Sequence, residues 1–381
     1  MQTLNNKQYH NATKIALILF ILGLSFTLLG FLYKKESCPA GENKHEKHNT
    51  QVIVKETTPV QPIQRESITF ILGEDRKDDN PYYTQATNYY RFNPDGKTEY
   101  VITTCRSLLE VRDYLANNPT SNDLPWKLVN LVSHGNQWLG LSVHVLPESK
   151  RATAELIHEC VDSGLFKPLP KSILDDKSTI YVHGCGVGKN PELIEAIRTA
   201  FGGNDTVPQV QSSVYFEYYS SDMSNNIVTD TRRYFAEVWY TIYKKGYRPE
   251  NAILSRKLNK EYPGCSINWV DALSREQPRW DGDIYHYTFQ IPVKWVIPYP
   301  DKESVPDVST LSKQLEWICT QKDIVETLEK MNIPKEKFNW WFRNVYVNND
   351  DGTQSPAIWV KGYSTILCVI QPIVKRMKVV N

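Results

Sequence analysis

Short apolar runs of strand length alternate with capped, helix-patterned segments along most of the chain after Ser67. The apolar runs end in polar residues, as buried strands do, and the segments between them repeat apolar positions at helical spacing. The expected strands are 67–72, 128–133, 138–146, 180–182 and 207–216, and the expected helices are 107–117, 152–162, 190–202 and 231–245. Alternation of this kind predicts an α/β fold with a mostly parallel sheet and helices on both faces. The reactive site of such a sheet lies beyond the carboxyl ends of its strands.

Two of the expected helices carry explicit start and stop signals. Ser107 and Glu110 have the spacing of a capping box. Asn190 can cap the later helix, Pro191 suits its first turn, and Gly202 is a stop signal. These signals predict helices that begin next to 107 and next to 190.

The segment Ile15–Tyr33 is different in kind, because its 19 residues (33 − 15 + 1) contain no charge. As a helix it would be about 28 Å long, close to the thickness of the hydrocarbon core of a bilayer. A cleaved signal peptide is the alternative, but the run is longer than a usual signal core and no small-x-small cleavage site comes after it. We therefore expect an uncleaved, single-pass membrane anchor.

Two arguments about the side of the membrane oppose each other. Lys34 and Lys35 come directly after the span, and by the positive-inside rule they would keep the bulk of the protein in the cytoplasm. A short tail before an early apolar span is instead typical of a signal anchor, which exports the rest of the chain. We take export, to the periplasm or the cell surface, as the prediction.

Composition divides the chain into four parts. Glu36–Glu66 is polar, contains three prolines and shows no periodicity, so we expect a flexible stalk with a reach of roughly 30 Å. A second linker, 298–306, precedes a helical pattern at 311–331 and a hairpin pattern formed by 343–347 and 357–360. The predicted organisation is a tail and anchor at 1–35, a stalk at 36–66, an α/β domain at 67–298 and a small C-terminal α+β unit at 307–381.

Overall composition argues against a nucleic-acid-binding protein. Lys and Arg number 44 against 43 Asp and Glu, which gives a net charge of +1, and no basic tract resembles a nucleic-acid footprint. The hydrophobic content of 41% is enough for a packed core. None of the seven cysteines has CxxC or Cys/His ligand spacing, so no structural zinc site is expected. Six cysteines remain besides Cys185, which permits disulfides without indicating any.

The ends of two strand candidates carry reactive side chains. The run Leu128–Ser133 leads to His134 and Gly135, and the run that begins at Thr179 leads to Cys185. A thiol and an imidazole are the two parts of a cysteine nucleophile with its own base. Cys185 lies 185 − 134 = 51 positions after His134, close to the roughly 50 positions between the catalytic His and Cys of caspases.

The order, spacing and flanking elements of Ser133-His134-Gly135 and Gly184-Cys185-Gly186 resemble the caspase–gingipain–clostripain clan of cysteine peptidases, and the likeness continues to Gln211-Ser212-Ser213. The resemblance implies a caspase-like three-layer sandwich and a cysteine endopeptidase, whose partner is a protein or peptide substrate. It implies that Cys185 attacks the scissile carbonyl as a thiolate and that His134 polarises the thiol or protonates the leaving amine. The backbone N–H groups of Gly135 and Cys185 would form the oxyanion hole. No metal or organic cofactor is implied, although some members of the clan depend on calcium.

The segment that would form the specificity pocket carries acidic residues. Caspases that cut after aspartate need arginines there, whereas this chain offers Ser213, Glu217 and Asp222. If the segment lines the pocket, its acidic groups would favour Arg or Lys just before the cut, as in gingipain-like and clostripain-like members. The alternative is that Glu217 and Asp222 are solvated loop residues.

Two other interpretations concern residues next to Cys185. His183 lies two residues earlier on the same strand face and could be taken for the base, although packing or local hydrogen bonding is the expected role.

The glycines of Gly184–Asn190 suggest a phosphate-binding loop. However, His183 stands where the first P-loop glycine is required, and Asn190 stands in place of Ser or Thr.

A non-enzymatic function is the competing hypothesis for the whole chain. A catalytically inactive caspase-like module could serve as a membrane-surface interaction or adhesion domain. The aromatic cluster at 338–342, with Trp359 and Tyr363, could contribute a ligand platform, although core packing is the commoner use of such rings.

Overall fold

The computed structural model describes residues 64–76, 81–203, 208–277, 282–349 and 351–373. The predicted anchor at 15–33 and almost all of the predicted stalk lie outside these residues. Within the described ranges no helix is both long enough and apolar enough to cross a membrane.

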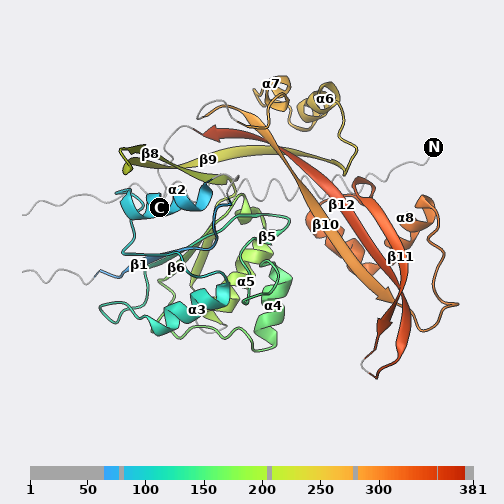
Figure 1. Cartoon of the computed structure of the whole chain (residues 1–381), viewed down its shortest axis with the longest axis horizontal. Helices are drawn as coiled ribbons and strands as arrows, with labels where there is room; N and C mark the ends of the chain where they lie inside the picture. Colours follow the sequence, from blue (N-terminus) through green and yellow to red (C-terminus); the bar gives the residue numbers. More distant parts are fainter. Residues whose placement is uncertain (1–63, 77–80, 204–207, 278–281, 350, 374–381) are drawn as a thin grey trace, which may run out of the picture. The chain divides into compact units, whose positions relative to one another are not determined.

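A five-stranded parallel sheet is built from the first part of the described chain, with the strand order β2-β1-β3-β6-β7 (Figure 1). Its strands are β1 (Ser67–Ile71), β2 (Tyr100–Ile102), β3 (Leu128–Val132), β6 (Thr179–His183) and β7 (Gln209–Ser212). The α/β fold with a mostly parallel sheet flanked by helices is therefore confirmed. The chain order reverses direction across the sheet between β1 and β3, and doubly wound sheets bind their ligands at such a switch point.

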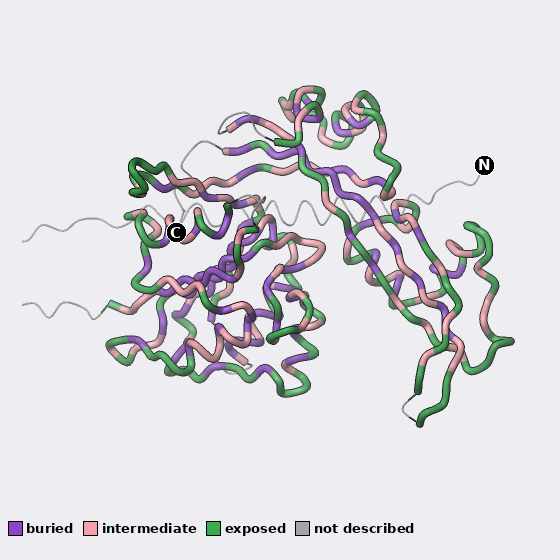
Figure 2. Tube along the Cα trace, viewed as in Figure 1, coloured by how far each residue is buried: buried purple, intermediate pink, exposed green. Residues whose placement is uncertain are grey.

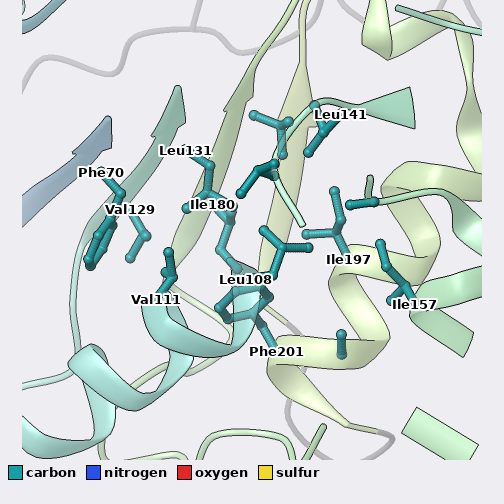
Figure 3. Packing of buried hydrophobic residues seen from close by; sticks show 14 of the residues in the cluster. Phe70, Leu108, Val111, Val129, Leu131, Leu141, Ile157, Ile180, Ile197 and Phe201 are labelled. Atoms are coloured by element: carbon teal, nitrogen blue, oxygen red, sulfur yellow. The ribbon is translucent and has the colours of Figure 1, made fainter. Parts of the chain in front are cut away.

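Three helices cover one face of this sheet. They are α3 (Leu108–Asn117), α4 (Ala154–Asp162) and α5 (Pro191–Gly202). On the central strands β1, β3 and β6 every second residue, such as Phe70, Leu131 and Ile180, points into this layer and is buried together with Leu108 and Phe201 (Figure 3). The period of two along the strands thus separates an apolar face from the opposite one.

The opposite face carries polar side chains under helix α2 (Tyr82–Phe92). Thr69, Asn130 and His183 occupy this face on β1, β3 and β6, and all three are buried. Helix α2 covers them with tyrosines and packs on β8 (Phe216–Ser224) through Tyr219. Helices therefore lie on both faces, as predicted.

The predicted helix caps are confirmed. Ser107 Oγ accepts the Glu110 N–H at 3.2 Å, and the Glu110 carboxylate accepts the Arg106 N–H at 2.6 Å. Asn190 Oδ1 accepts the Leu193 N–H at 3.0 Å at the start of α5. Each cap satisfies amide groups that would otherwise be orphaned in the first turn.

An antiparallel sheet with the order β10-β12-β9-β8, and β11 on β12, comes next in the chain. Its strands besides β8 are β9 (Ile227–Lys244), β10 (Tyr285–Pro298), β11 (Asn339–Asn348) and β12 (Gln354–Ile373). Residues from both sides of the predicted linker at 298–306 share this sheet, because β12 pairs with both β9 and β10. The far end of the β11–β12 hairpin is exposed, whereas the middle of β12 is buried (Figure 2).

Besides α2, four helices of the described chain pack on the antiparallel sheet. Helices α8 (Leu311–Thr320) and α9 (Lys322–Met331) cover one face through Trp317, Ile318, Ile324 and Leu328. Helices α6 (Asn251–Glu261) and α7 (Trp269–Leu273) pack through Leu254 and Trp269 on Leu367 and Val369 of β12. The remaining short elements are β4 (Gly135–Asn136), β5 (Gly140–Leu141) and the single-turn helices η1 (Val187–Lys189) and η2 (Lys335–Lys337).

The helix predicted at 231–245 is wrong, because these residues belong to strand β9. Phe235, Val238, Trp239 and Ile242 have helical spacing, but they extend along β12 in antiparallel register. Tertiary pairing here overrides a local pattern. The strands predicted at 138–146 and 207–216 are also too long. Only 140–141 form a strand within the first, and the second contains 209–212 and the first residue of β8, Phe216.

The other C-terminal predictions are confirmed with changed bounds. The helical pattern at 311–331 is interrupted at Gln321, which separates α8 from α9. The predicted hairpin exists and is longer, since β11 and β12 pair from Asn339↔Tyr363 to Asn348↔Gln354.

Candidate active site

His134 and Cys185 lie just beyond two strands that run side by side. Strands β3 and β6 are parallel neighbours with Val132 opposite His183, and the Ser133 N–H donates to the His183 carbonyl at 3.0 Å. His134 is the next residue after this bond on one strand, and Cys185 is the second residue after it on the other. The two motifs therefore lie at the same carboxyl edge of the sheet.

Glycines allow the two loops to approach each other closely. A Cβ on Gly135 would lie 3.1 Å from Val187 Cγ2, and a Cβ on Gly184 would lie 2.7 Å from that same methyl carbon. The Gly184 position is also 3.3 Å from the Ser133 carbonyl oxygen. Larger side chains at either position would force the loops apart.

Two tyrosines of helix α2 hold His134. The Tyr82 ring stacks on the imidazole with centroids 4.5 Å apart, and the Tyr83 ring meets it edge-on at 4.8 Å. The His134 backbone N–H donates to the Tyr83 hydroxyl at 3.1 Å. Both tyrosines are buried, whereas His134 is exposed, so the imidazole has a fixed position at the surface.

Tyr82 also lies within electrostatic reach of Cys185. Burial raises the pKa of the Tyr82 hydroxyl well above its usual value, and a negative charge on Cys185 would raise it further. Because the same ring stacks on His134, Tyr82 connects the surroundings of both predicted catalytic groups.

The Cys185 thiol is held in its protonated form. Burial raises the pKa of this thiol to about 12, although its hydrogen bond to the Glu217 carbonyl oxygen, with Sγ and O 3.7 Å apart, acts in the opposite direction. The thiolate is the reactive form of cysteine, so the raised pKa leaves Cys185 unreactive in this conformation.

The cavity next to Cys185 is small, and Cys185 itself is half-buried. The volume of the cavity is about 10 Å³, which holds at most about one water molecule. It is lined by Gln137, Trp138, Cys185, Gly186, Lys189, Phe216, Val238 and Tyr240. The lining comes from the loop after His134, from the loop after β6 and from strands β8 and β9.

Trp138 is the residue that joins the His134 loop to the antiparallel sheet. Its ring lies 5.0 Å from the Tyr240 ring and 5.6 Å from the Phe289 ring, and its Nε1–H donates to the Met331 carbonyl at 3.2 Å. Tyr285 of β10 also lies close to Cys185, because a charge on the thiol contributes to the raised pKa of Tyr285. The antiparallel sheet therefore lies next to Cys185, which is half-buried.

The ladder geometry supports Gly135 as an oxyanion donor. The Ser142 N–H donates to the His134 carbonyl at 2.7 Å, so Gly135 and Leu141 form the next, non-hydrogen-bonded pair of the hairpin. The Gly135 N–H therefore points out of the hairpin. Its partnership with the Cys185 N–H around a substrate oxygen stays a prediction.

The predicted pocket residues are not brought together. Ser213 is buried, and its Oγ accepts the Tyr215 N–H at 3.0 Å. Glu217 is buried with its carboxylate against His183, whereas Asp222 is exposed and pairs with Arg232 at 3.1 Å. Only Glu217 lies next to Cys185, and it does so through its main-chain oxygen.

His183 is the centre of a buried hydrogen-bond network. Its Nδ1 lies 2.8 Å from Glu217 Oε2, and its Nε2 lies 2.8 Å from the Tyr90 hydroxyl and 3.0 Å from Asn130 Oδ1. Burial lowers the pKa of His183, and the adjacent Glu217 opposes part of this effect. With both ring nitrogens engaged, His183 is a structural histidine, although its partners are distant in sequence rather than local.

The glycine-rich loop does not present a phosphate cradle. The Gly186 N–H donates to Tyr215 and the Gly188 N–H donates to Ser213, so two of the amide groups that would bind a phosphate are occupied. A Cβ on Gly188 would lie 2.6 Å from the Ser212 carbonyl oxygen, which shows that β7 fills the space beside the loop. A larger hollow of about 470 Å³ lies beside β7, but neither Cys185 nor His134 lines it.

Sequence reasoning missed the tyrosines of α2, although a signal was present. Tyr82 and Tyr83 recur seven residues later as Tyr89 and Tyr90, which places all four near one face of a helix after two turns. All four are buried against the sheet.

The described cysteines are all free thiols, namely Cys105, Cys160, Cys185, Cys265, Cys319 and Cys368. Among the described residues no group of three or more His, Cys, Asp and Glu side chains is arranged to hold a metal ion. Comparison with protein-family models, with curated proteins and with solved structures found no match for this chain.

Proposed function

We propose that this protein is a caspase-like cysteine endopeptidase in which Cys185 is the nucleophile and His134 is the acid–base group. The observation that carries the proposal is the Ser133–His183 bond between neighbouring parallel strands. It supports a thiol and an imidazole at one edge of the sheet, next to the switch point. The contacts of Tyr82 and Tyr83 with His134 support a fixed imidazole rather than a freely rotating one.

The proposed reaction is acyl transfer through a thioester. His134 takes the thiol proton, and the sulfur of Cys185 forms a bond to the scissile carbonyl carbon. The N–H of Gly135 and the N–H of Cys185 stabilise the oxyanion. The carbon–nitrogen bond then breaks, His134 returns the proton to the leaving amine, and water hydrolyses the thioester.

The small volume of the cavity at Cys185 favours a mechanism in which substrate binding displaces Trp138. A bound ligand of moderate size needs about 300–1,000 Å³, whereas the cavity at Cys185 measures about 10 Å³. Trp138 lies in the loop between β4 and β5, so movement of this loop would widen the access to the thiol. Opening would also return water to the sulfur and lower its pKa, since burial is the largest cause of the shift.

A reactive peptide probe tests the dyad. The full chain is treated with a peptidyl acyloxymethyl ketone, and the labelling rate of each cysteine is read by mass spectrometry in the wild type, Trp138→Ala and His134→Ala. We expect labelling of Cys185 to rise in Trp138→Ala and to fall about a hundredfold when His134→Ala is added. His158→Ala is the matched control, because His158 is an exposed histidine on α4, away from the site.

Two results would contradict the dyad. Labelling of Cys185 that is unchanged by His134→Ala would remove the role of the imidazole. Preferential labelling of the exposed Cys319 in every variant would mean that exposure alone governs reactivity.

We propose a preference for Arg or Lys before the cut, with Glu217 as its anchor. Glu217 Oε2 is bonded to His183, but Glu217 Oε1 is buried and has no hydrogen-bond partner among the described residues. A buried carboxylate oxygen without a partner favours a cationic side chain. A panel of fluorogenic peptides should show Arg or Lys preferred and the preference reduced in Glu217→Gln; a preference for Asp or for uncharged residues would refute it.

Membrane anchoring by Ile15–Tyr33, with the catalytic part exported, remains part of the proposal. Its test is the accessibility of Cys319 to a membrane-impermeant maleimide on intact cells, since this thiol is exposed. Labelling only after lysis would reverse the orientation.

A catalytically inactive interaction module is the second candidate function. The observation that favours it is the protonated thiol next to Trp138, Phe216 and Tyr240. The probe experiment separates the two candidates, because an inactive module would show no dependence of Cys185 labelling on His134 even after Trp138→Ala.

A further inference from the structure

One face of the antiparallel sheet carries four cations and three large aromatic rings, all of them exposed or half-buried. We call it the cationic face, and its residues are Lys245, Lys294, Trp341, Arg343, Trp359, Lys361 and Tyr363. Helices α8 and α9 pack on the other face of this part of the sheet, where Trp340 and Val293 are buried.

Strand register places these residues in neighbouring rows. Trp341, Lys361 and Lys294 lie side by side across β11, β12 and β10. The next row holds Arg343, Trp359 and Val296, and the previous row holds Asn339, Tyr363 and Pro292. None of these nine positions is acidic.

Three of the four cations contact rings rather than carboxylates. Lys245 Nζ lies 4.4 Å from the centre of the Tyr363 ring and Lys361 Nζ lies 4.6 Å from it, while Arg343 lies 5.7 Å from the Trp359 ring. The Trp341 ring lies edge-on to Tyr363 at 5.4 Å, and 42% of Trp341 is exposed.

None of the four cations forms an ion pair with a carboxylate in the described part of the chain. Four unpaired positive charges are therefore gathered on one face of a chain whose net charge is only +1. Such a concentration of charge selects an anionic partner.

We propose that the cationic face docks onto the anionic headgroups of a lipid bilayer. Trp, Tyr, Lys and Arg are the residues that accumulate at the membrane interface, where rings lie at headgroup depth and cations meet lipid phosphates. Three adjacent strands present these side chains over an area rather than along a line, which suits a membrane surface better than an extended peptide.

The strength of such docking fits a tethered protein. Each cation near an anionic surface strengthens binding by roughly fivefold, so four give a factor of several hundred. That is weak for a free protein but sufficient for one already held at the bilayer, because the tether makes docking intramolecular. The predicted anchor at 15–33 and the stalk, with its reach of roughly 30 Å, would supply this tether.

The test is the exposure of Trp341 next to membranes of different charge. The full chain is incorporated into nanodiscs of phosphatidylcholine alone or with phosphatidylserine, and hydroxyl-radical oxidation of each side chain is read by mass spectrometry. We expect oxidation of Trp341 to fall at least about threefold with the anionic lipid and to recover in 0.5 M salt, which screens the charges. Tyr346 is an internal control, since it is 62% exposed on the opposite face of β11 and should not change.

Charge reversal supplies the matched variants. Lys294→Glu with Lys361→Glu should abolish the protection of Trp341. Lys167→Glu with Lys171→Glu makes the same change in net charge at exposed lysines outside the antiparallel sheet and should leave the protection intact.

Other occupants of the cationic face give different results. Equal oxidation of Trp341 in both nanodiscs, or protection that persists in the Lys294→Glu, Lys361→Glu variant, overturns the proposal. Protection in detergent that grows with protein concentration would assign the face to a second copy of the chain. Protection by heparin but not by anionic lipid would assign it to a soluble polyanion.

Discussion

Acidification should destabilise this protein through His183. The imidazole is buried, and burial is the largest cause of its lowered pKa. The unfolded imidazole takes up a proton below about pH 6.5, whereas the folded one does not until the pH is lower. The unfolded state therefore binds more protons in that interval, and the free energy of unfolding falls as the pH falls.

The magnitude depends on the number of protons involved. One proton taken up only on unfolding gives a slope of at most about 1.4 kcal/mol per pH unit, reached below pH 6.5 and lost again below the folded pKa. The charged groups around the ring act in both directions, since Glu217 on β8 raises the pKa of His183 and Arg233 on β9 lowers it. Tyr90 on α2 contributes its hydroxyl to Nε2.

Urea unfolding of the full chain in a mild detergent, monitored by tryptophan fluorescence at pH 7.5, 6.5 and 5.5, measures this slope. His183→Gln removes the titrating group and keeps a polar side chain that can bond to Glu217, so its profile should be flatter than that of the wild type. His158→Gln removes an exposed histidine on α4 and should retain the wild-type slope. The same slope in the wild type and in His183→Gln would refute the reasoning.

Three further predictions concern the elements that position the site. Gly140→Ala should lower the free energy of unfolding in urea by about 3 kcal/mol or more, because Gly140 has φ +69° and its added Cβ would lie 2.1 Å from the Ala152 carbonyl oxygen. The control Gly164→Ala, with φ +74° and open space around the added Cβ, should lower it by about 1 kcal/mol. Equal losses in the two variants would contradict the packing argument. Asn190 caps α5, so Asn190→Ala should lower the free energy of unfolding by about 1 kcal/mol. The backbone amides in the first turn of α5 should also exchange faster with deuterium. Unchanged exchange would argue against the cap. Phe201→Ala should lower the free energy of unfolding by about 3–5 kcal/mol, because Phe201 is fully buried. Leu165 is 60% exposed, so Leu165→Ala should change it by less than about 0.5 kcal/mol. Thermal unfolding distinguishes these outcomes, and similar shifts in the two variants would mean that Phe201 is poorly packed.

The parallel sheet was predictable because its signals are local. The runs at 128–132 and 179–183 are short, mostly apolar and mostly buried, and the cap at Asn190 acts within four residues. Strand β9 was not predictable by the same rule. One face of it packs with Val238, Tyr240 and Ile242 in one cluster, while Trp239 and Tyr243 on the other face pack in a second cluster. Burial on both faces removes the alternation by which a strand is recognised.

The same distinction between local and long-range signals applies to the residues of the candidate site. His134 and Cys185 were located from strand ends, because parallel neighbours bring their carboxyl ends to one edge. The roles of Trp138 and Glu217 depend on contacts with Tyr240 and His183, which lie far away in sequence. Nothing within the segments around Trp138 or Glu217 specifies those contacts.

The side chains that line the cavity beside Cys185 affect both the access of a peptide to the thiol and the pKa of the thiol. The groups that leave little room for a peptide in the cavity, Trp138, Phe216 and Tyr240, also limit the contact of water with the half-buried Cys185. Because burial is the largest cause of the raised thiol pKa, the movement that admits a substrate also rehydrates the sulfur and increases the thiolate fraction. His134 needs no corresponding change, since Tyr82 and Tyr83 hold it through helix α2 rather than through the side chains that line the cavity. In the proposed peptidase, one displacement of Trp138 would therefore open the site and activate its nucleophile, while the base stays in place.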